Sequence, residues 1–238
     1  MSSCCPNCGS GHIRPLNATT IRCAACSYIG PIGTQSTRPT STNDSLASDV
    51  YEKVHNSVLE ITCDDGSGSG FLIDPRGYAI TNAHVVEQSE GVLSSGFNAR
   101  IGGGQWVGFR VVKTFGKHCT NNDIALVKLV TLPRDAVVAQ MGNSDQIKTG
   151  AKIFVIGNSL GHGTCIVDGI VSDNNRNGQI MHNAASNGGN SGGPVFDRNG
   201  EVISVHVSKQ LKGSGAEAHG MSYSIPINQV RNLIRGIL

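Results

Sequence analysis

The feature that most limits the fold is a series of short runs rich in β-branched residues, repeated from about residue 50 to residue 225. Glycine-rich turns separate these runs, seven of which read GFLID, YAITNAHVV, FRVVKTF, IALVKLV, KIFVIG, TCIVDGIVS and EVISVHVS. β-Branched side chains favour strands, and many short strands joined by turns are typical of a barrel or a sandwich. The sequence therefore predicts an all-β domain.

Two segments with helical spacing bracket this region. In DVYEKVHNSVLEITC, Val50, Val54 and Val58 are spaced as on a helix before the pattern becomes that of a strand, which places the start of the domain near Asp49. The last segment, IPINQVRNLIRGIL, has a candidate cap at Asn228 followed by apolar residues on one face. We therefore expect a C-terminal helix packed on the β domain.

Residues 1–30 contain two CxxC pairs, CPNC and CAAC. Cys5, Cys8, Cys23 and Cys26 can bring four thiolates to one tetrahedral Zn²⁺ ion, and so short a segment holds too little apolar mass to fold without a cross-link. The segment resembles zinc ribbons; a redox pair or unliganded thiols are the alternatives. Residues 31–48, rich in Ser, Thr and Pro, are expected to form a flexible linker to a domain at 49–238.

The stretch NGGNSGGPV places Ser191 among four glycines. A serine hydroxyl is a poor nucleophile, so acyl transfer needs a base, a carboxylate that orients the base, and donors for the oxyanion. If Gly189 adopts a backbone conformation closed to residues with a Cβ, the amides of Gly189 and Ser191 can face the same side and form such an oxyanion hole. Ser191 is therefore a candidate nucleophile.

A base and a carboxylate are found earlier in the chain. His84 ends a strand-like run and opens a turn in AITNAHVV, where its ring can project into a cleft. Asp123 directly precedes the apolar run IALVKL, and a charge buried there must be paired. His, Asp and Ser thus occur in that order.

At these residues the chain resembles trypsin-like serine proteases of the HtrA (Deg) type, since GSGF, TNAHVV, DIALVKL, GNSGGP and YSIPI follow one another over roughly residues 50–238. The resemblance implies a chymotrypsin-like fold of two six-stranded antiparallel barrels with the active site between them. It implies His84 as general base, Asp123 as its orienting partner, Ser191 as nucleophile, and the amides of Gly189 and Ser191 as the oxyanion hole. The implied activity is that of a serine endopeptidase.

The chain departs from this family in two places. It ends at Leu238, with no PDZ domain behind the final helix, which leaves the family's oligomeric behaviour open. The aspartate of the family's TDAA stretch is also missing, because the chain reads MHNAA, with His182 and Asn183.

The expected substrate pocket points to a specificity other than Lys or Arg. Ala185 takes the position of the acidic residue of tryptic enzymes. His206, fifteen residues after Ser191, and the hydroxyl of Ser186 resemble glutamyl endopeptidases and the chymotrypsin-like proteases of positive-strand RNA viruses. An imidazole and a hydroxyl donate hydrogen bonds to a carboxylate or carboxamide, which predicts cleavage after Glu or Gln. The alternative is that His206 is a strand residue bonded to a neighbouring carbonyl.

Charge and composition restrict the partners and the location. A formal net charge of +2, from 19 basic and 17 acidic residues, gives no strong field for nucleic acid or a membrane surface. No apolar run is long enough to span a membrane, and the first thirty residues lack the apolar core of a signal peptide. Val85 also replaces the cysteine that follows the catalytic histidine in many secreted relatives. We therefore expect an intracellular protein, cytoplasmic or nuclear and not secreted.

The expected partners are a protein or peptide substrate and structural Zn²⁺, with no cofactor needed for catalysis. Two other functions stay open. The barrels could be a catalytically inactive scaffold that binds peptides, or the zinc ribbon could direct the chain to nucleic acid or a protein complex. Arg14 and Arg22 are the only charged residues in the first thirty, which permits contact with nucleic acid without requiring it.

Overall fold

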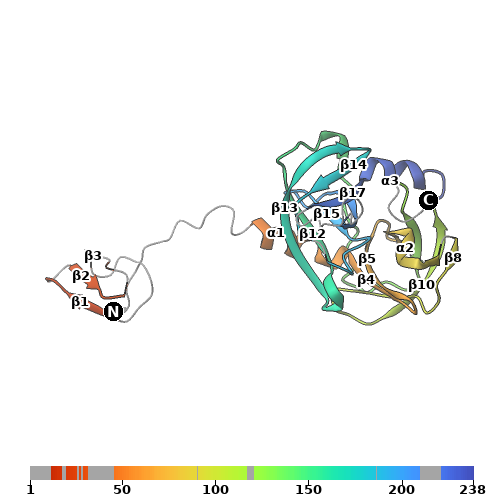
Figure 1. Ribbon diagram of the computed structural model, residues 1–238. Coiled ribbons are helices and arrows are strands. Elements are labelled where there is room, and N and C mark those ends of the chain that lie inside the picture. Colours follow the sequence, from red (N-terminus) through yellow and green to blue (C-terminus); the bar gives the residue numbers. More distant parts are fainter. Residues whose placement is uncertain are drawn as a thin grey trace. The chain divides into compact units, whose positions relative to one another are not determined.

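The computed structural model describes residues 12–17, 20–25, 27, 29–31, 46–89, 91–116, 121–185, 187–209 and 221–238 (Figure 1). The chain divides into two compact units, residues 1–45 and residues 46–238. The second unit begins with helix α1 (Leu46–Val54), three residues before the predicted boundary at Asp49, and Val50 and Val54 of this helix are buried.

The N-terminal unit contains a three-stranded antiparallel sheet in the order β1 (Ile13–Pro15), β2 (Thr20–Cys23), β3 (Ile29–Pro31). Side chains alternate between the two faces of a strand. In β2, Ile21 and Cys23 are accordingly buried while Arg22 is exposed, and Arg22 lies directly opposite Arg14 of β1. One face of this small sheet is therefore basic.

The first barrel of the second unit closes in the strand order β10-β11-β6-β5-β4-β9. Its strands are β4 (Val58–Cys63), β5 (Gly66–Leu72), β6 (Tyr78–Thr81), β9 (Asn98–Ile101), β10 (Val107–Thr114) and β11 (Ala125–Leu129). Between β6 and β9 in the sequence lie the short helix α2 (Ala83–Val86) and a two-stranded sheet, formed by β7 (Glu87–Ser89) and β8 (Val92–Leu93). A closed barrel leaves no edge strand without a partner.

The second barrel closes in the order β12-β13-β14-β17-β16-β15. Its strands are β12 (Lys152–Asn158), β13 (Thr164–Arg176), β14 (Gln179–His182), β15 (Pro194–Phe196), β16 (Val202–Lys209) and β17 (Ser222–Pro226). Single 3₁₀ turns are η1 (His55–Ser57), η2 (Ser144–Gln146) and η3 (Ser159–Gly161), and helix α3 (Ile227–Ile234) follows β17. The predicted all-β fold of two six-stranded barrels with a C-terminal helix is confirmed.

The start of α3 differs from the prediction that Asn228 caps it. The helix begins at Ile227, so Asn228 lies inside its first turn. The Asn228 N–H donates to Ser144 Oγ at 3.1 Å, and its side-chain amide donates to Asn143 Oδ1 at 2.7 Å. The amide groups left over at a helix start need acceptors, and here a turn more than eighty residues away supplies one. Local sequence alone could not show this.

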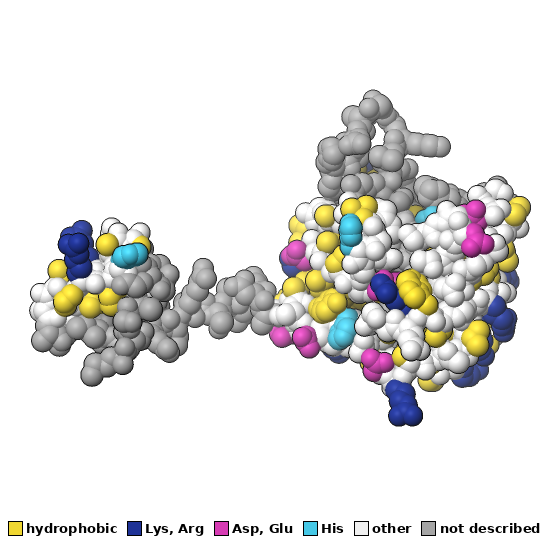
Figure 2. All heavy atoms as spheres, turned by 90° about the horizontal axis from the view of Figure 1, so that it is seen from below, with side chains coloured by type: hydrophobic (Ala, Val, Ile, Leu, Met, Phe, Trp, Pro, Cys, Tyr) yellow, Lys and Arg dark blue, Asp and Glu magenta, His cyan; other side chains and the backbone are white. Residues whose placement is uncertain are grey.

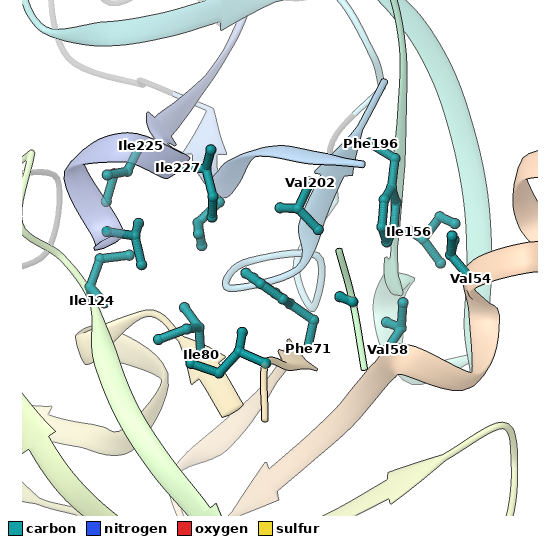
Figure 3. Packing of buried hydrophobic residues seen from close by; sticks show 14 of the residues in the cluster. Val54, Val58, Phe71, Ile80, Ile124, Ile156, Phe196, Val202, Ile225 and Ile227 are labelled. Carbon is teal, nitrogen blue, oxygen red and sulfur yellow. The ribbon is translucent and has the colours of Figure 1, made fainter. Parts of the chain in front are cut away.

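One apolar cluster joins the two barrels. It includes Phe71 and Ile80 from the first barrel and Ile156, Phe196 and Val202 from the second, all fully buried (Figure 3). A fully buried side chain of this size stabilises the fold by roughly 1.5–3 kcal/mol. Because the cluster is continuous, it holds the two barrels, and any site between them, in one arrangement.

Candidate active site

His84 and Asp123 are brought together by the pairing of β6 with β11. Thr81 lies opposite Ala125 in this pair, so the residues that follow β6 meet those that precede β11. His84 Nδ1 lies 2.7 Å from Asp123 Oδ2, and the backbone N–H of His84 donates to Asp123 Oδ1 at 3.1 Å. The carboxylate is completely buried, and Asn82 Nδ2 donates to the Asp123 carbonyl at 2.6 Å.

This arrangement determines where the imidazole carries its proton. An ionised carboxylate only accepts hydrogen bonds, so Nδ1 of His84 must be the protonated nitrogen. The other ring nitrogen, Nε2, then carries the lone pair with which the imidazole can act as a base. The His84 side chain is 21% exposed, so its ring is open to solvent while Asp123 is not.

Ser191 lies on the turn between β14 and β15, against the segment that carries His84. Gly192 allows this approach, because a Cβ there would lie 2.3 Å from Thr81 Oγ1 and 2.8 Å from Asn82 N. The Ser191 hydroxyl donates to the carbonyl of Val207 at 2.6 Å. A hydroxyl has one proton, so it must turn away from Val207 before it can donate to an imidazole.

The loop at 188–192 holds its peptide groups in an alternating pattern. The carbonyls of its first four residues accept hydrogen bonds: Gly188 from Leu160 N–H at 2.7 Å, Gly189 from Ser69 Oγ at 2.6 Å, Asn190 from Gly193 N–H at 3.0 Å, and Ser191 from Ser69 N–H at 2.8 Å. The amides of Asn190 and Gly192 donate to Asn187 O and His206 O. Within the described residues, the amides of Gly189 and Ser191 donate to nothing, so they are the two groups left to bind an anion.

Gly189 has a backbone conformation that requires glycine. Its φ is +94°, and a Cβ at this position would lie 2.0 Å from the carbonyl oxygen of Asn158. L-residues with a Cβ rarely adopt such a φ. The glycine is therefore needed both for the turn and for the close approach to the end of β12.

His206 of β16 is completely buried and lies next to His182 of β14. His206 Nδ1 is 3.3 Å from His182 Nε2, and the ring centroids are 5.3 Å apart. Burial lowers the pKa of His182 to about 4, and it lowers the pKa of His206 well below its ordinary value, with smaller contributions from His182 and His84. Both rings are therefore neutral at pH 7.

Of the other two predicted pocket residues, Ala185 is exposed, and Ser186 lies outside the described residues.

Of the four predicted zinc ligands, the structure describes only Cys23, since Cys5, Cys8 and Cys26 lie outside the described residues. Cys23 is buried at the end of β2, and the Ala25 N–H donates to its sulfur at 3.4 Å. An amide donor stabilises a thiolate, so Cys23 fits the predicted role. The described residues contain no group of three or more His, Cys, Asp or Glu that could hold a metal.

Three polar residues of this region were assigned no site role from the sequence: Ser69, Asn82, and His182, which was noted only as a departure from the family's TDAA stretch. Each is completely buried. Ser69 and Asn82 belong to the quoted motifs GSGF and TNAHVV, so the available signal was their place inside motifs that carry the resemblance. A buried polar side chain needs a partner, and that partner identifies its role.

No helix within the described part of the chain has the length and apolar character needed to cross a membrane. Figure 2 shows acidic and basic side chains interspersed on the face of the barrel unit that it presents.

Comparison with known proteins gives consistent matches. Residues 68–205 match the family model described as a trypsin-like peptidase domain. HhoA of Synechocystis sp. is 29% identical over 236 residues, 91% of this chain and 56% of HhoA. The periplasmic serine endoprotease DegP of Salmonella typhimurium is 33% identical over 175 residues, 70% of this chain and 34% of DegP. The chain thus spans about half or less of these relatives.

A solved structure of the HtrA-type protease AlgW with a tripeptide has the same fold. The two chains align with a TM-score of 0.69 at 24% identity, covering 80% of this chain and 63% of AlgW. At this identity the likeness concerns the fold.

The expected intracellular location is wrong, because these relatives include DegP proteins of Salmonella typhimurium and Escherichia coli that are named periplasmic. That expectation was based on the lack of an apolar signal-peptide core in residues 1–30, on the cysteine pattern, and on Val85 at the position of a cysteine of many secreted relatives. Cys63 and Cys165 of the barrel unit are free cysteines. An oxidising compartment permits disulfides but does not require them, so unpaired cysteines do not determine the location.

Proposed function

Because the chain belongs to the family of trypsin-like peptidase domains, with relatives of the HtrA and DegP type, we propose that it is a serine endopeptidase acting on proteins or peptides. The observation that carries this proposal is the buried Asp123 carboxylate bonded to His84, beside a loop with two amides that have no acceptor among the described residues. A scaffold that only binds peptides has no need of this combination.

Each residue has a distinct part in the proposed reaction. His84 Nε2 takes the proton of the Ser191 hydroxyl as the oxygen attacks the scissile carbonyl carbon. The developing oxyanion accepts hydrogen bonds from the amides of Gly189 and Ser191. His84 then donates the proton to the leaving amine, and water hydrolyses the acyl-enzyme by the same route. Asp123 keeps the imidazole oriented and stabilises its charged form.

We further propose that His206 contributes to a preference for Glu or Gln at the residue before the cleaved bond, with Ser186 and Ala185 as the other candidate pocket residues. The strand of His206 supports this, since its N–H donates to Gly193 O and its carbonyl accepts from Gly192 N–H, directly after Ser191. A neutral imidazole brings no charge to balance a carboxylate. Gln is therefore favoured over Glu before the cleaved bond at neutral pH.

The N-terminal unit is proposed to be a zinc ribbon in which Cys5, Cys8, Cys23 and Cys26 hold structural Zn²⁺. When bound, the ion would cross-link a segment too small for a stable core of its own. Catalysis needs no metal in this scheme. Metal analysis of the purified chain should find about one zinc per chain, and Cys23→Ser should lower that content.

The same unit is proposed to contact an anionic partner, either nucleic acid or an acidic protein segment. Arg14 and Arg22 lie side by side on adjacent strands, and both line a hollow of about 500 Å³ with Leu16, Cys23, Ala24 and Ser27. Figure 2 shows basic side chains beside hydrophobic ones on this unit. Like charges directly opposite on a sheet repel, and a bound anion removes that cost. Salt-dependent retention of the full chain on RNA or DNA, lost in Arg14→Gln with Arg22→Gln, would distinguish nucleic acid from a protein partner.

Cleavage of a peptide library by the full chain and by Ser191→Ala, read by mass spectrometry, tests the enzyme. Loss of the nucleophile in a serine protease lowers kcat by about a million-fold, so products that persist in the variant come from a contaminant. Cleavage after Glu or Gln that is lost in His206→Ala supports the pocket. Cleavage after small aliphatic residues keeps the protease and rejects the pocket. If the chain neither cleaves peptides nor reacts with a fluorophosphonate probe, the inactive scaffold is the better description.

A further inference from the structure

Ser69 of β5 is a completely buried serine whose polar atoms are all hydrogen-bonded, mostly to the other barrel. Its N–H donates to Ser191 O at 2.8 Å, and its hydroxyl donates to Gly189 O at 2.6 Å. The hydroxyl oxygen also accepts from the N–H of Asn158 at 2.8 Å, and its carbonyl accepts from Thr81 Oγ1 at 2.6 Å. One side chain of the first barrel thus reaches the loop that carries Ser191.

The two loop carbonyls that Ser69 binds occupy specific places in the alternating pattern. In a trans peptide the C=O and the following N–H point in opposite directions. Ser69 therefore orients the peptide groups 189–190 and 191–192. The peptide between them, 190–191, provides the Ser191 amide, and the peptide before them provides the Gly189 amide. A peptide group cannot rotate freely when both of its neighbours are held.

Gly189 makes this support necessary. Glycine at a φ of +94° has no Cβ that would resist rotation of the adjoining peptide groups, so the Gly189 amide depends on surrounding hydrogen bonds for its direction. Leu160 N–H holds the carbonyl of Gly188 on one side, and the Ser69 hydroxyl holds the carbonyl of Gly189 on the other. Without the hydroxyl, one of these two restraints is lost.

The glycines around Ser69 are the ones that its approach requires. A Cβ on Gly68 would lie 2.6 Å from the Val85 side chain and 3.1 Å from Ser191 O, and a Cβ on Gly157 would lie 2.7 Å from Ser69 Oγ. Gly68 therefore lets β5 approach the loop closely enough for the serine to bond to it, and Gly157 leaves room for the serine hydroxyl.

We propose that Ser69 is a positioning residue for the oxyanion hole: its amide and hydroxyl hold the loop at 188–192 so that the amides of Gly189 and Ser191 align toward a developing oxyanion. The inference rests on the proposed function as a serine endopeptidase. Ser69 does not touch the substrate in this scheme, so its effect should fall on the chemical step and leave substrate binding unchanged.

The test compares Ser69→Ala with the matched control Ser67→Ala, an exposed serine on the same strand. Removal of one oxyanion donor lowers kcat by about 10²–10³, so loss of a support should lower kcat by roughly 10- to 100-fold with KM within about twofold. A peptide boronate forms a tetrahedral adduct on the nucleophile, and its affinity should fall in parallel with kcat/KM. Ser67→Ala should match the unaltered chain in kcat, in KM and in boronate affinity.

The outcomes separate this inference from the proposed function. No hydrolysis by the unaltered chain rejects the proposed function and this inference with it. An active chain with an unchanged kcat in Ser69→Ala overturns the positioning role alone, as does a KM that rises while kcat stays constant. The emission of Trp106, the only tryptophan, reports whether the barrel unit is folded. If Ser69→Ala does not fold, the Ser69→Cys variant is tested in its place, because a thiol fills the site of the hydroxyl but is a weak hydrogen-bond donor. A normal kcat and a normal boronate affinity of Ser69→Cys would reject the proposal.

Discussion

Asp123 accepts two hydrogen bonds from one residue, His84, through the imidazole Nδ1 and through the backbone N–H. The second bond ties the start of helix α2 to the carboxylate, so ring and backbone are oriented by the same group. The side chain of Asp123 is completely buried, and each of its two carboxylate oxygens accepts a hydrogen bond from this one residue.

Asp123→Asn should lower kcat by about 10⁴ while leaving the fold intact. An asparagine that turns its NH₂ group toward the ring donates to Nδ1, which moves the imidazole proton to Nε2 and removes the base. Steady-state kinetics on a cleaved library peptide measure this. Asp135→Asn, at an exposed position of the same barrel unit, is the control and should retain full activity. Activity above a tenth of normal in Asp123→Asn would contradict the assigned role.

Gly189→Ala should lower kcat by about 10²–10³, because a Cβ 2.0 Å from Asn158 O forces the loop to move and misaligns an oxyanion donor. The matched control is Gly150→Ala. Gly150 has a similar positive φ, +88°, and no atom lies within 4 Å of the place that a Cβ would take, so the variant carries the backbone strain without the clash. Both variants should lose about 1 kcal/mol of stability from strain, and only Gly189→Ala should lose activity. Equal activity in the two would argue against Gly189 as a donor.

The fold was predictable because its signals are local. β-Branched runs and glycine turns mark the strands, and His84, Asp123 and Ser191 each lie in a distinctive short motif. The order in which the strands close into barrels depends on pairings such as β4 with β9 and β15 with β12, which no single segment encodes. The C-terminal helix was predicted, but its start was not, because Ser144 supplies the acceptor from far away in the sequence.

The supporting residues of the site escaped prediction for the same reason. Ser69 and Gly189 are 120 residues apart, and His182 and His206 are 24 apart on strands that are not neighbours in the barrel. In the sequence each is an ordinary polar residue in or beside a strand. Only the folded chain shows that their partners are each other and that burial makes these contacts obligatory.

The barrel unit should lose stability as the pH falls from about 6.5 toward 4. His182 has a pKa of about 4 in the folded chain, against 6.5 for an ordinary histidine, so between these values the unfolded chain binds a proton that the folded chain does not. The neutral, buried His182 contributes its full stabilisation above pH 6.5. About 3 kcal/mol of the unfolding free energy is lost by the time the pH reaches 4. His206, whose pKa is also lowered by burial, acts in the same direction.

Urea unfolding followed by Trp106 emission at several pH values measures this dependence for the barrel unit. His182→Gln keeps a polar partner for His206 and removes the titrating group, so its unfolding free energy should depend less on pH between 6.5 and 4. His162→Gln, at an exposed position, is the control and should keep the normal slope. Identical slopes in all three proteins would show that His182 is not buried in its neutral form.

Glu60 links the barrels through a buried carboxylate, and its replacement should destabilise the fold. Its side chain is 2% exposed, and Oε2 accepts from Arg100 Nε at 3.0 Å and Nη2 at 2.9 Å. Oε1 accepts from Thr164 Oγ1 of the second barrel at 3.2 Å. Breaking a buried ion pair costs about 3–5 kcal/mol, and because Arg100 is 29% exposed and can be hydrated, Glu60→Gln should cost about 1–3 kcal/mol.

A double-mutant cycle isolates the contact between the barrels. Thr164→Val removes the hydroxyl with little change in volume, and Glu60→Gln combined with Thr164→Val should cost less than the sum of the single changes, by about 0.5–1 kcal/mol. The guanidinium of Arg100 lies 4.7 Å from the ring centre of Trp106, so Trp106 emission should also shift in the folded Glu60→Gln protein. Thr164→Val alone should leave that emission unchanged. Strict additivity in the cycle would contradict a charge-assisted hydrogen bond between Thr164 and Glu60, and the apolar cluster would then be the main connection between the barrels.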